Sequence, residues 1–139
     1  MKIKLKNSNL EFVSKILYGK EFSESELRSG SVGNEGNSNA TRTVVFDVRN
    51  ISNIKFVTSN SRIEKIDYLF WTSESAIGKF VTEGNPGGES FESAGSHSTK
   101  VNTFITIPDG IKGMSISVLT PKATTIEYKN EINYYKKTL

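Results

Sequence analysis

The chain has 139 residues, of which 35% are hydrophobic and 24% charged, and its formal net charge is +3. This length suits one domain with a core of its own, and the composition is that of ordinary globular proteins. The absence of cysteine excludes disulfides and thiolate chemistry, and no apolar run reaches the roughly 18–20 residues that cross a bilayer, so we expect no membrane insertion. Lysines alternate with glutamates and do not cluster, which argues against binding to nucleic acid.

The N-terminal region is expected to differ from the rest of the chain. We predict an N-terminal arm over residues 1–25, a possible attachment segment, and a β-sandwich domain over residues 26–139. Within the arm, residues 2–6 alternate lysine with apolar residues, which indicates a short strand. Residues 10–18 fit both an extended segment and a helical stripe, and the two alternatives stay open. Residues 22–28 are expected to form one helical turn, because a serine and a glutamate there have capping-box spacing.

The strongest pattern in the chain lies between residues 41 and 71. Three runs of alternating β-branched and aromatic residues are separated there by turns rich in asparagine and serine. Alternation with period 2 between such turns is typical of half-buried antiparallel strands. The apolar positions expected to face the core are Val44, Phe46 and Val48, then Ile54 and Phe56, then Ile66, Tyr68 and Phe70.

The remaining elements are short and are separated by Gly-, Ser- and Pro-rich segments. We expect a loop at 29–39, a strand at 77–81, a loop at 82–100, strands at 101–107, 114–118 and 125–128, and a basic tail at 132–139. The Pro-Asp-Gly sequence at 108–110 predicts a tight turn. With about eight short strands and no helix pattern of ten residues, the sequence predicts an all-β, antiparallel β-sandwich.

The Gly- and Asn-rich loop at 29–39 contains oxygen donors that could hold a calcium ion. It lacks the Asp-x-Asp spacing of a calcium loop, and it lacks the Lys-Ser/Thr pair and the following helix of a phosphate-binding loop. We therefore predict neither a metal ion nor a cofactor.

Catalysis requires a nucleophile with a base, a pair of carboxylates or a metal ion. His97 is the single histidine, so a Ser-His-Asp triad would have to use it, and a three-histidine metal site is impossible. Asp47 and Asp67 are both expected on strand faces opposite the core, where solvated surface acids are the ordinary explanation. We predict that the chain is not an enzyme.

Sugar binding requires an aromatic platform with amide, carboxylate or guanidinium groups beside it. Trp71 is the candidate platform, and the alternative is that its ring covers the second sheet or an oligomer contact. Arg42 and Arg62 could serve hydroxyls or acidic sugars, or could form ion pairs with Asp47 or Asp67. The candidate glycan contacts are therefore Trp71, Arg42, Arg62, Asp47 and Asp67.

The order of these segments carries a resemblance. A Gly/Asn loop leads into an Arg-Thr strand at 39–48, strands at 54–56 and 66–71 follow, and a strand ending in Ile-Pro at 103–108 precedes the alternating strand at 114–118. Over about residues 30–120 this resembles the small jelly-roll, carbohydrate-binding-like β-sandwich modules of bacteriophage fibre and receptor-binding proteins. Those modules usually carry a basic residue where Ser115 or Ser117 stands here, so a contact through that residue does not carry over.

The resemblance implies a jelly-roll-like sandwich and a function without catalysis. It implies a structural module of the virion, in a head or tail fibre or a decoration protein, that binds host-surface glycan. The implied partners are other virion proteins and further copies of the chain, for example in a trimer. The alternative is a carbohydrate-binding module of a bacterial glycan-utilisation protein, located outside the cell or at its surface.

Overall fold

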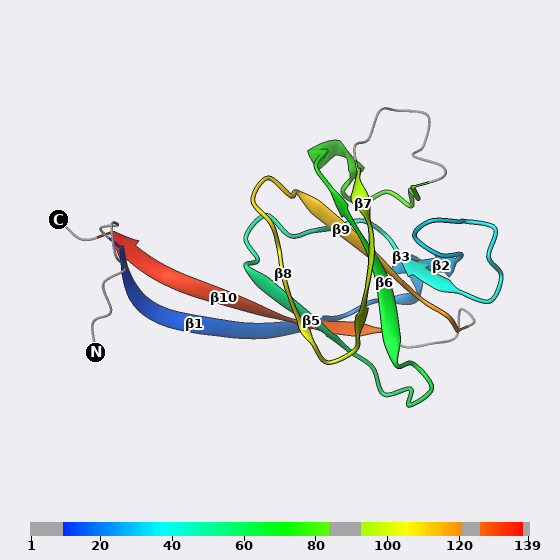
Figure 1. Cartoon of the computed structure of the whole chain (residues 1–139), viewed down its shortest axis with the longest axis horizontal. Coiled ribbons are helices and arrows are strands. Elements are labelled where there is room, and N and C mark those ends of the chain that lie inside the picture. Colours follow the sequence, from blue (N-terminus) through cyan, green and yellow to red (C-terminus); the bar gives the residue numbers. More distant parts are fainter. Residues whose placement is uncertain (1–9, 84–92, 121–125, 138–139) are drawn as a thin grey trace.

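The structure is a computed structural model, and it describes residues 10–83, 93–120 and 126–137 (Figure 1). Side chains are described over residues 21–83, 97–120 and 126–127. All the regular elements in these ranges are strands, apart from two 3₁₀ helices, η1 (Glu24–Glu26) and η2 (Glu74–Ala76). The strands are β1 (Leu10–Glu21), β2 (Leu27–Ser29), β3 (Thr41–Thr43), β4 (Phe46–Asp47), β5 (Asn53–Val57), β6 (Lys65–Trp71), β7 (Ser93–Lys100), β8 (Phe104–Thr106), β9 (Gly113–Val118) and β10 (Glu127–Lys137).

These strands form two antiparallel sheets. The four-stranded sheet has the order β1-β10-β5-β8, and the six-stranded sheet has the order β2-β3-β9-β6-β7, with β4 also paired to β9. The prediction of an all-β antiparallel sandwich is confirmed, whereas a jelly-roll topology stays a prediction. In the described ranges neither helix exceeds one turn, and neither could therefore cross a bilayer.

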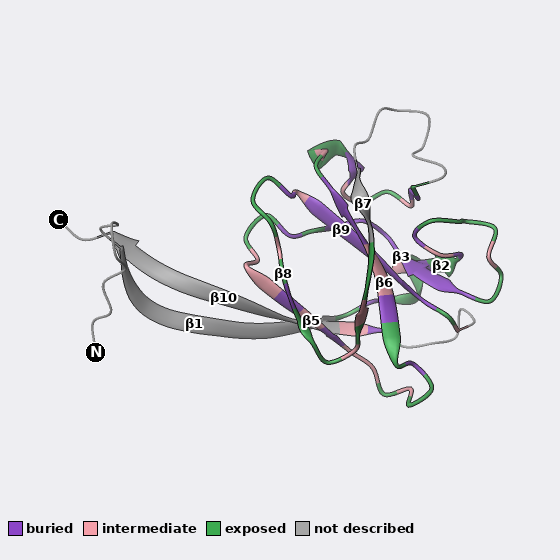
Figure 2. Cartoon of the chain, in the orientation of Figure 1, coloured by how far each residue is buried: buried purple, intermediate pink, exposed green. Residues whose placement is uncertain are grey.

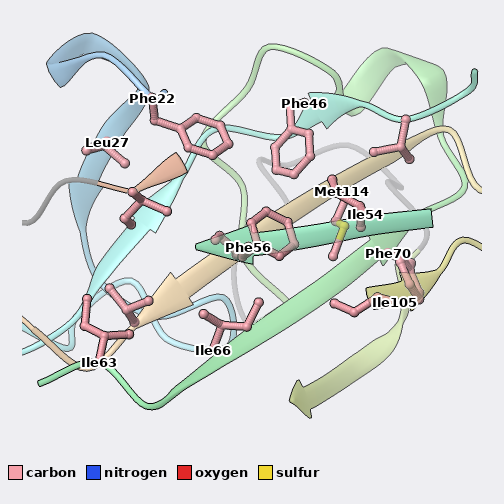
Figure 3. Close-up of a cluster of buried hydrophobic side chains, with 14 of the residues drawn as sticks. Phe22, Leu27, Phe46, Ile54, Phe56, Ile63, Ile66, Phe70, Ile105 and Met114 are labelled. Carbon is pink, nitrogen blue, oxygen red and sulfur yellow. The ribbon is translucent and has the colours of Figure 1, made fainter. Parts of the chain in front are cut away.

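The main hydrophobic core lies between the two sheets (Figure 3). The inward residues of β5, Ile54 and Phe56, face those of β6 and β9 across it, including Ile66 and Met114. All four side chains are buried. Figure 2 shows buried stretches of β6 and β9 in purple. The alternation read from the central stretch is therefore confirmed for β5 and β6.

A second hydrophobic cluster covers the outer face of the six-stranded sheet. Its buried members are Val32, Val45, Leu69, Trp71, Ala76 and Val81. Leu69 and Trp71 come from the outward side of β6, whereas Val32 belongs to the loop after β2, and Ala76 and Val81 come from the segment after β6. The six-stranded sheet is therefore covered on both faces along β9, which explains why every residue of that strand is buried.

Strands β1 and β10 pair with each other along their length, from Leu10 opposite Lys137 to Glu21 opposite Glu127. Strand β5 pairs with β10 only as far as Glu131. Beyond Glu131, β1 and β10 continue together as a two-stranded ribbon that projects away from the sandwich (Figure 1). Residues 10–18 are thus extended, as one of the two alternatives had it. The boundary of the arm at residue 25 stays a prediction, although β1 is part of the four-stranded sheet.

Four predicted elements differ in the structure. The first run of the central stretch is interrupted at Val44 and Val45, because Val45 exchanges backbone hydrogen bonds with Gly78 and Lys79 instead of with a strand. The predicted strand at 77–81 is wrong, since those residues form turns and Gly78 has a φ of +88°.

The other two differences concern segments with a weak pattern. Within the predicted loop at 82–100, residues 84–92 lie outside the described residues, and the eight residues SAGSHSTK form strand β7, which pairs with β6. The predicted basic tail at 132–139 is mostly the end of β10.

The predicted helical turn is confirmed as η1, where Ser23 N donates to Glu26 Oε1 at 3.1 Å. The predicted strand at 2–6 lies outside the described residues.

Candidate functional site

Trp71 lies on the outward side of β6, as its alternation predicts, but its side chain is fully buried. The indole Nε1 donates a hydrogen bond of 3.0 Å to Ser115 Oγ on β9. The ring offers no exposed face in this structure. This fits the alternative that Trp71 covers the sheet, and it does not fit an aromatic platform for a sugar.

Arg42 is also buried, with 6% of its side-chain and backbone surface exposed. Its guanidinium carbon lies 5.7 Å from the ring centroid of Phe80, and that of Arg28 lies 4.0 Å from the same centroid. Arg42 has no ion pair with Asp47 or Asp67 among the contacts of the described residues. It therefore offers nothing to a sugar hydroxyl at the surface.

Asp47 forms a small surface network with Arg49 and Glu74. Arg49 donates to Asp47 through Nε at 2.9 Å and through Nη2 at 2.8 Å, and its Nη1 is paired with Glu74. The hydrogen bond from Arg49 holds the pKa of the Asp47 carboxyl below its usual value. The carboxylate of Asp47 is thus already occupied by a neighbour on its own chain.

Asp67 and Arg62 line one pocket of about 190 Å³ on the outer side of the six-stranded sheet, together with the exposed Leu119. Asp67 accepts a hydrogen bond from Ser98 Oγ on β7. Asp67 stands opposite Ser117 and Asp47 opposite Gly113, on the two sides of β9. Four residues of strand separate the two acids by about 13 Å along β9, which is too far for the carboxylate pair of a glycosidase.

His97 does not complete a catalytic triad with the serine and the acid nearest to it. It stands opposite Tyr68 on β6, and the two rings stack with centroids 5.3 Å apart. Ser98 and Asp67 stand opposite each other one position along, and successive residues of a strand point to opposite faces. The strand register thus places the His97 side chain on the other face from the Ser98–Asp67 hydrogen bond, although all three residues line one pocket of about 340 Å³.

An exposed aromatic residue occurs instead on the four-stranded sheet. Phe104 of β8 is 41% exposed, while its neighbour Ile105 points into the core. Lys55 stands opposite Phe104 on β5, and its Nζ lies 4.7 Å from the ring centroid. Two residues along, Thr106 Oγ1 donates to Asn53 Oδ1 at 3.0 Å. One face of the sheet therefore presents an aromatic ring, an ammonium group, an amide and a hydroxyl in a row.

This face continues into a polar pocket with a volume of about 650 Å³. Asn53 and Thr106 belong to both the exposed face and the pocket. The loop before β5 and the loop after β8 form the rest of the pocket wall. The pocket is lined by Val48, Arg49, Asn50, Ile51, Ser52, Asn53, Thr106, Ile107, Pro108, Asp109, Gly110 and Ile111. Together the ring and the pocket supply the platform and the amide, hydroxyl and carboxylate groups that recognition of a sugar requires.

Phe104 is absent from the candidates read from the sequence, although a signal for it was present. If Ile105 and Ile107 face the core, then Phe104 must fall on the outward face, with Asn102 and Thr106. A large aromatic residue on the polar side of a strand is a stronger sign of a binding platform than one at the end of an apolar run.

No group of three or more His, Asp or Glu side chains gathers as metal ligands would in the described part of the chain.

Comparison with known proteins identifies no relative. No protein-family model, no curated protein and no solved structure matches the chain. The resemblance to phage fibre modules therefore stays a prediction. The assignment of a function depends on the surface formed by Phe104, Lys55, Asn53 and Thr106 with the adjoining pocket, which is called the Phe104 face below.

Proposed function

We propose that the chain is a non-enzymatic β-sandwich module that binds glycan through the Phe104 face, within a phage fibre or decoration protein. The observation that carries the glycan part is the exposed ring of Phe104 beside the polar pocket of about 650 Å³. Exposed aromatic side chains of this kind stack on the apolar face of a pyranose ring, and neighbouring polar groups then select its hydroxyl pattern.

The polar neighbours are arranged to fix the orientation of a sugar. Because Asn53 Oδ1 accepts the Thr106 hydroxyl, its amide nitrogen is directed to donate elsewhere, toward a ligand hydroxyl. Lys55 Nζ lies over the Phe104 ring and adds an ammonium group on one face of it, which leaves the other face for a sugar. The pocket provides acceptors at the far end, including the exposed Asp109. A sugar bound here would be held by one stacking contact and several hydrogen bonds, with no group placed for chemistry on it.

The assembly part of the proposal is supported by the β1–β10 ribbon. An isolated two-stranded antiparallel ribbon is marginally stable in water, and the free edge of a long strand readily pairs with another chain. A ribbon that projects beyond its sheet suits a segment that is completed by contact with neighbours. We propose further copies of the chain and other virion proteins as those neighbours, and the virion as the location.

A glycan array tests the binding function. Phe104→Ala should weaken binding by about tenfold or more, since aromatic anchors of this kind dominate small interfaces. Leu119→Ala is the matched control, because Leu119 is the other large apolar side chain exposed in the described residues and directly follows β9 of the opposite sheet. Binding that is equal in the parent and in Phe104→Ala, or absent throughout, would refute the proposal.

The assembly part has a separate test. Size-exclusion chromatography with light scattering should give a mass that is a multiple of the monomer, and the protein should bind phage particles. A strict monomer without affinity for phage particles, but with glycan binding intact, would instead favour the bacterial glycan-utilisation module.

A further inference from the structure

A row of polar side chains crosses the outer face of the six-stranded sheet. The strand register places Arg28, Arg42, Ser117, Asp67 and Ser98 directly opposite one another, on β2, β3, β9, β6 and β7 in turn. Directly opposed residues of antiparallel strands point to the same face. The two cations therefore stand at one end of the row, and the single carboxylate, Asp67, stands two strands away from Arg42.

Arg42 is the least satisfied member of this row. Its Nε and Nη1 are buried and have no hydrogen-bond partner, and they are the only such side-chain atoms in the described part of the chain. A buried N–H group without a partner costs about 1–3 kcal/mol, and more when it belongs to a charged group. Native proteins rarely retain such a group unless an ion, a water molecule or a ligand accounts for it.

The second cation is held close to the first by an aromatic ring. The guanidinium carbons of Arg28 and Arg42 lie 4.0 Å and 5.7 Å from the ring centroid of Phe80. Burial lowers the pKa of Arg42, the charge of Glu35 opposes this, and the charge of Arg28 lowers it further. Two like charges therefore share one ring, although Arg28 is exposed and Arg42 is not. An anion between them would relieve both the repulsion and the missing hydrogen bonds.

The cover over Arg42 is a loop that is closely fitted at a single glycine. A Cβ atom at Gly30, which has a φ of +118°, would lie 2.9 Å from Arg42 Nε and 2.8 Å from the carbonyl oxygen of Glu35. The loop is fastened to the row through Val32 N, which donates to Ser117 Oγ at 3.0 Å, and to the segment after β6 through Val32 O, which accepts from Glu83 N at 2.9 Å. Its other hydrogen bonds include those within its own turns. An anion would reach the buried N–H groups through a displacement of this loop around Gly30.

We propose that Arg28, Arg42 and Phe80 form a binding site for a compact oxyanion, a phosphate or a carboxylate. Arg28 attracts the anion from solvent, and Phe80 holds the guanidinium of Arg28 in place. Arg42 supplies its Nε and Nη1 donors, which have no partner in the protein. The site is separate from the Phe104 face, since the two lie on the outer faces of different sheets. The outcome of the glycan test therefore leaves it unaffected.

Thermal unfolding at pH 7 tests the site, with chloride, inorganic phosphate and glucuronate compared at matched ionic strength. Phosphate, glucuronate or both should raise Tm above the chloride value, by about 3 °C or more once the concentration is about ten times Kd. A shift with one anion only assigns the phosphate or the carboxylate as the preferred group. General salt effects on Tm are removed by comparison with Arg28→Ala, which retains them.

Arg28→Ala should lose the anion-specific shift while it folds normally, because Arg28 is exposed. Arg62 is an exposed arginine in the pocket of about 190 Å³ that Asp67 and Leu119 also line, on the same sheet. Arg62→Ala should keep the full anion-specific shift in Tm. Arg42→Met removes the buried charge at similar volume, and it should be at least as stable as the parent in chloride and insensitive to the anions. Equal anion shifts in the parent and in Arg28→Ala, or no shift in the parent, would overturn the proposal even if Arg42→Met fails to fold.

Discussion

Trp71 Nε1 donates a buried hydrogen bond of 3.0 Å to Ser115 Oγ on the neighbouring strand. Two positions along β9, Ser117 Oγ accepts an equally buried hydrogen bond from Val32 N in the covering loop. Both serines therefore hold parts of the cover on the outer face of the six-stranded sheet.

The Trp71–Ser115 hydrogen bond should contribute measurably to stability. Ser115→Ala leaves the buried indole N–H without a partner, which should cost about 1–3 kcal/mol in the free energy of unfolding. Trp71→Ala should cost about 3–5 kcal/mol, because it also leaves a cavity. Urea unfolding measures both, with the exposed Leu119→Ala as a control expected within about 0.5 kcal/mol of the parent. A Ser115→Ala variant as stable as the parent would contradict this.

Two glycines should respond in opposite ways to the same added methyl group. At Gly113 on β9 a Cβ atom would lie 2.6 Å from Val45 Cγ1, so Gly113→Ala should cost about 1–3 kcal/mol through overpacking. At Gly33 in the covering loop nothing lies within 4 Å of such an atom, so Gly33→Ala should be neutral or stabilising by about 0.4–1 kcal/mol. Chemical denaturation of both variants decides the matter. A Gly113→Ala variant as stable as the parent, or an equal loss in both variants, would contradict this prediction.

The Asp47–Arg49 pair should make part of the stability depend on pH. The pKa of Asp47 is below the ordinary 3.8 in the folded chain, so the unfolded chain binds its proton first as the pH falls. The stabilisation is therefore fully present above about pH 5 and is lost as the pH falls through the lowered pKa. Asp47→Asn should lower Tm slightly at pH 7 and reduce the fall in Tm between pH 5 and pH 3.

The comparison variant for this pair is Asp109→Asn, which alters an exposed aspartate in another loop. It should retain the acid sensitivity of the parent. Because Asp47 and Arg49 are largely exposed, the pair contributes little in absolute terms and less at high salt. An Asp47→Asn variant whose Tm follows the parent at every pH would contradict the assignment.

The strands of the central stretch could be predicted because each has a period-2 pattern with one clear apolar face. In β6 that pattern even places Trp71 on the correct side of the sheet. Its burial could not be predicted, because the covering residues Val32, Ala76 and Val81 come from segments without any pattern of their own. A buried outer face arises from contacts between distant segments, and local alternation carries no information about them.

The segments that were predicted wrongly fail for related reasons. The run SAGSHSTK has little β propensity, and it becomes strand β7 because the free edge of β6 pairs with it. Residues 77–81 have β-branched and aromatic residues but lie outside the sheets, since Gly78 turns the chain and bonds to Val45. The candidate site was likewise predictable only in part. Alternation alone places Phe104 outward, whereas the adjoining pocket is formed by two loops that are distant in sequence, which no local pattern predicts.

The pairing of Leu10 with Lys137 brings the two ends of the described fold to the same tip of the ribbon. Tension applied between these ends would act across the strand pairs one at a time, as in opening a zipper, and not along all of them together in shear. The ribbon would therefore peel apart at low force from its tip toward Glu21 and Glu127, before any load reached the sandwich. A module held through both ends would extend in two stages, and the first stage would leave the Phe104 face intact.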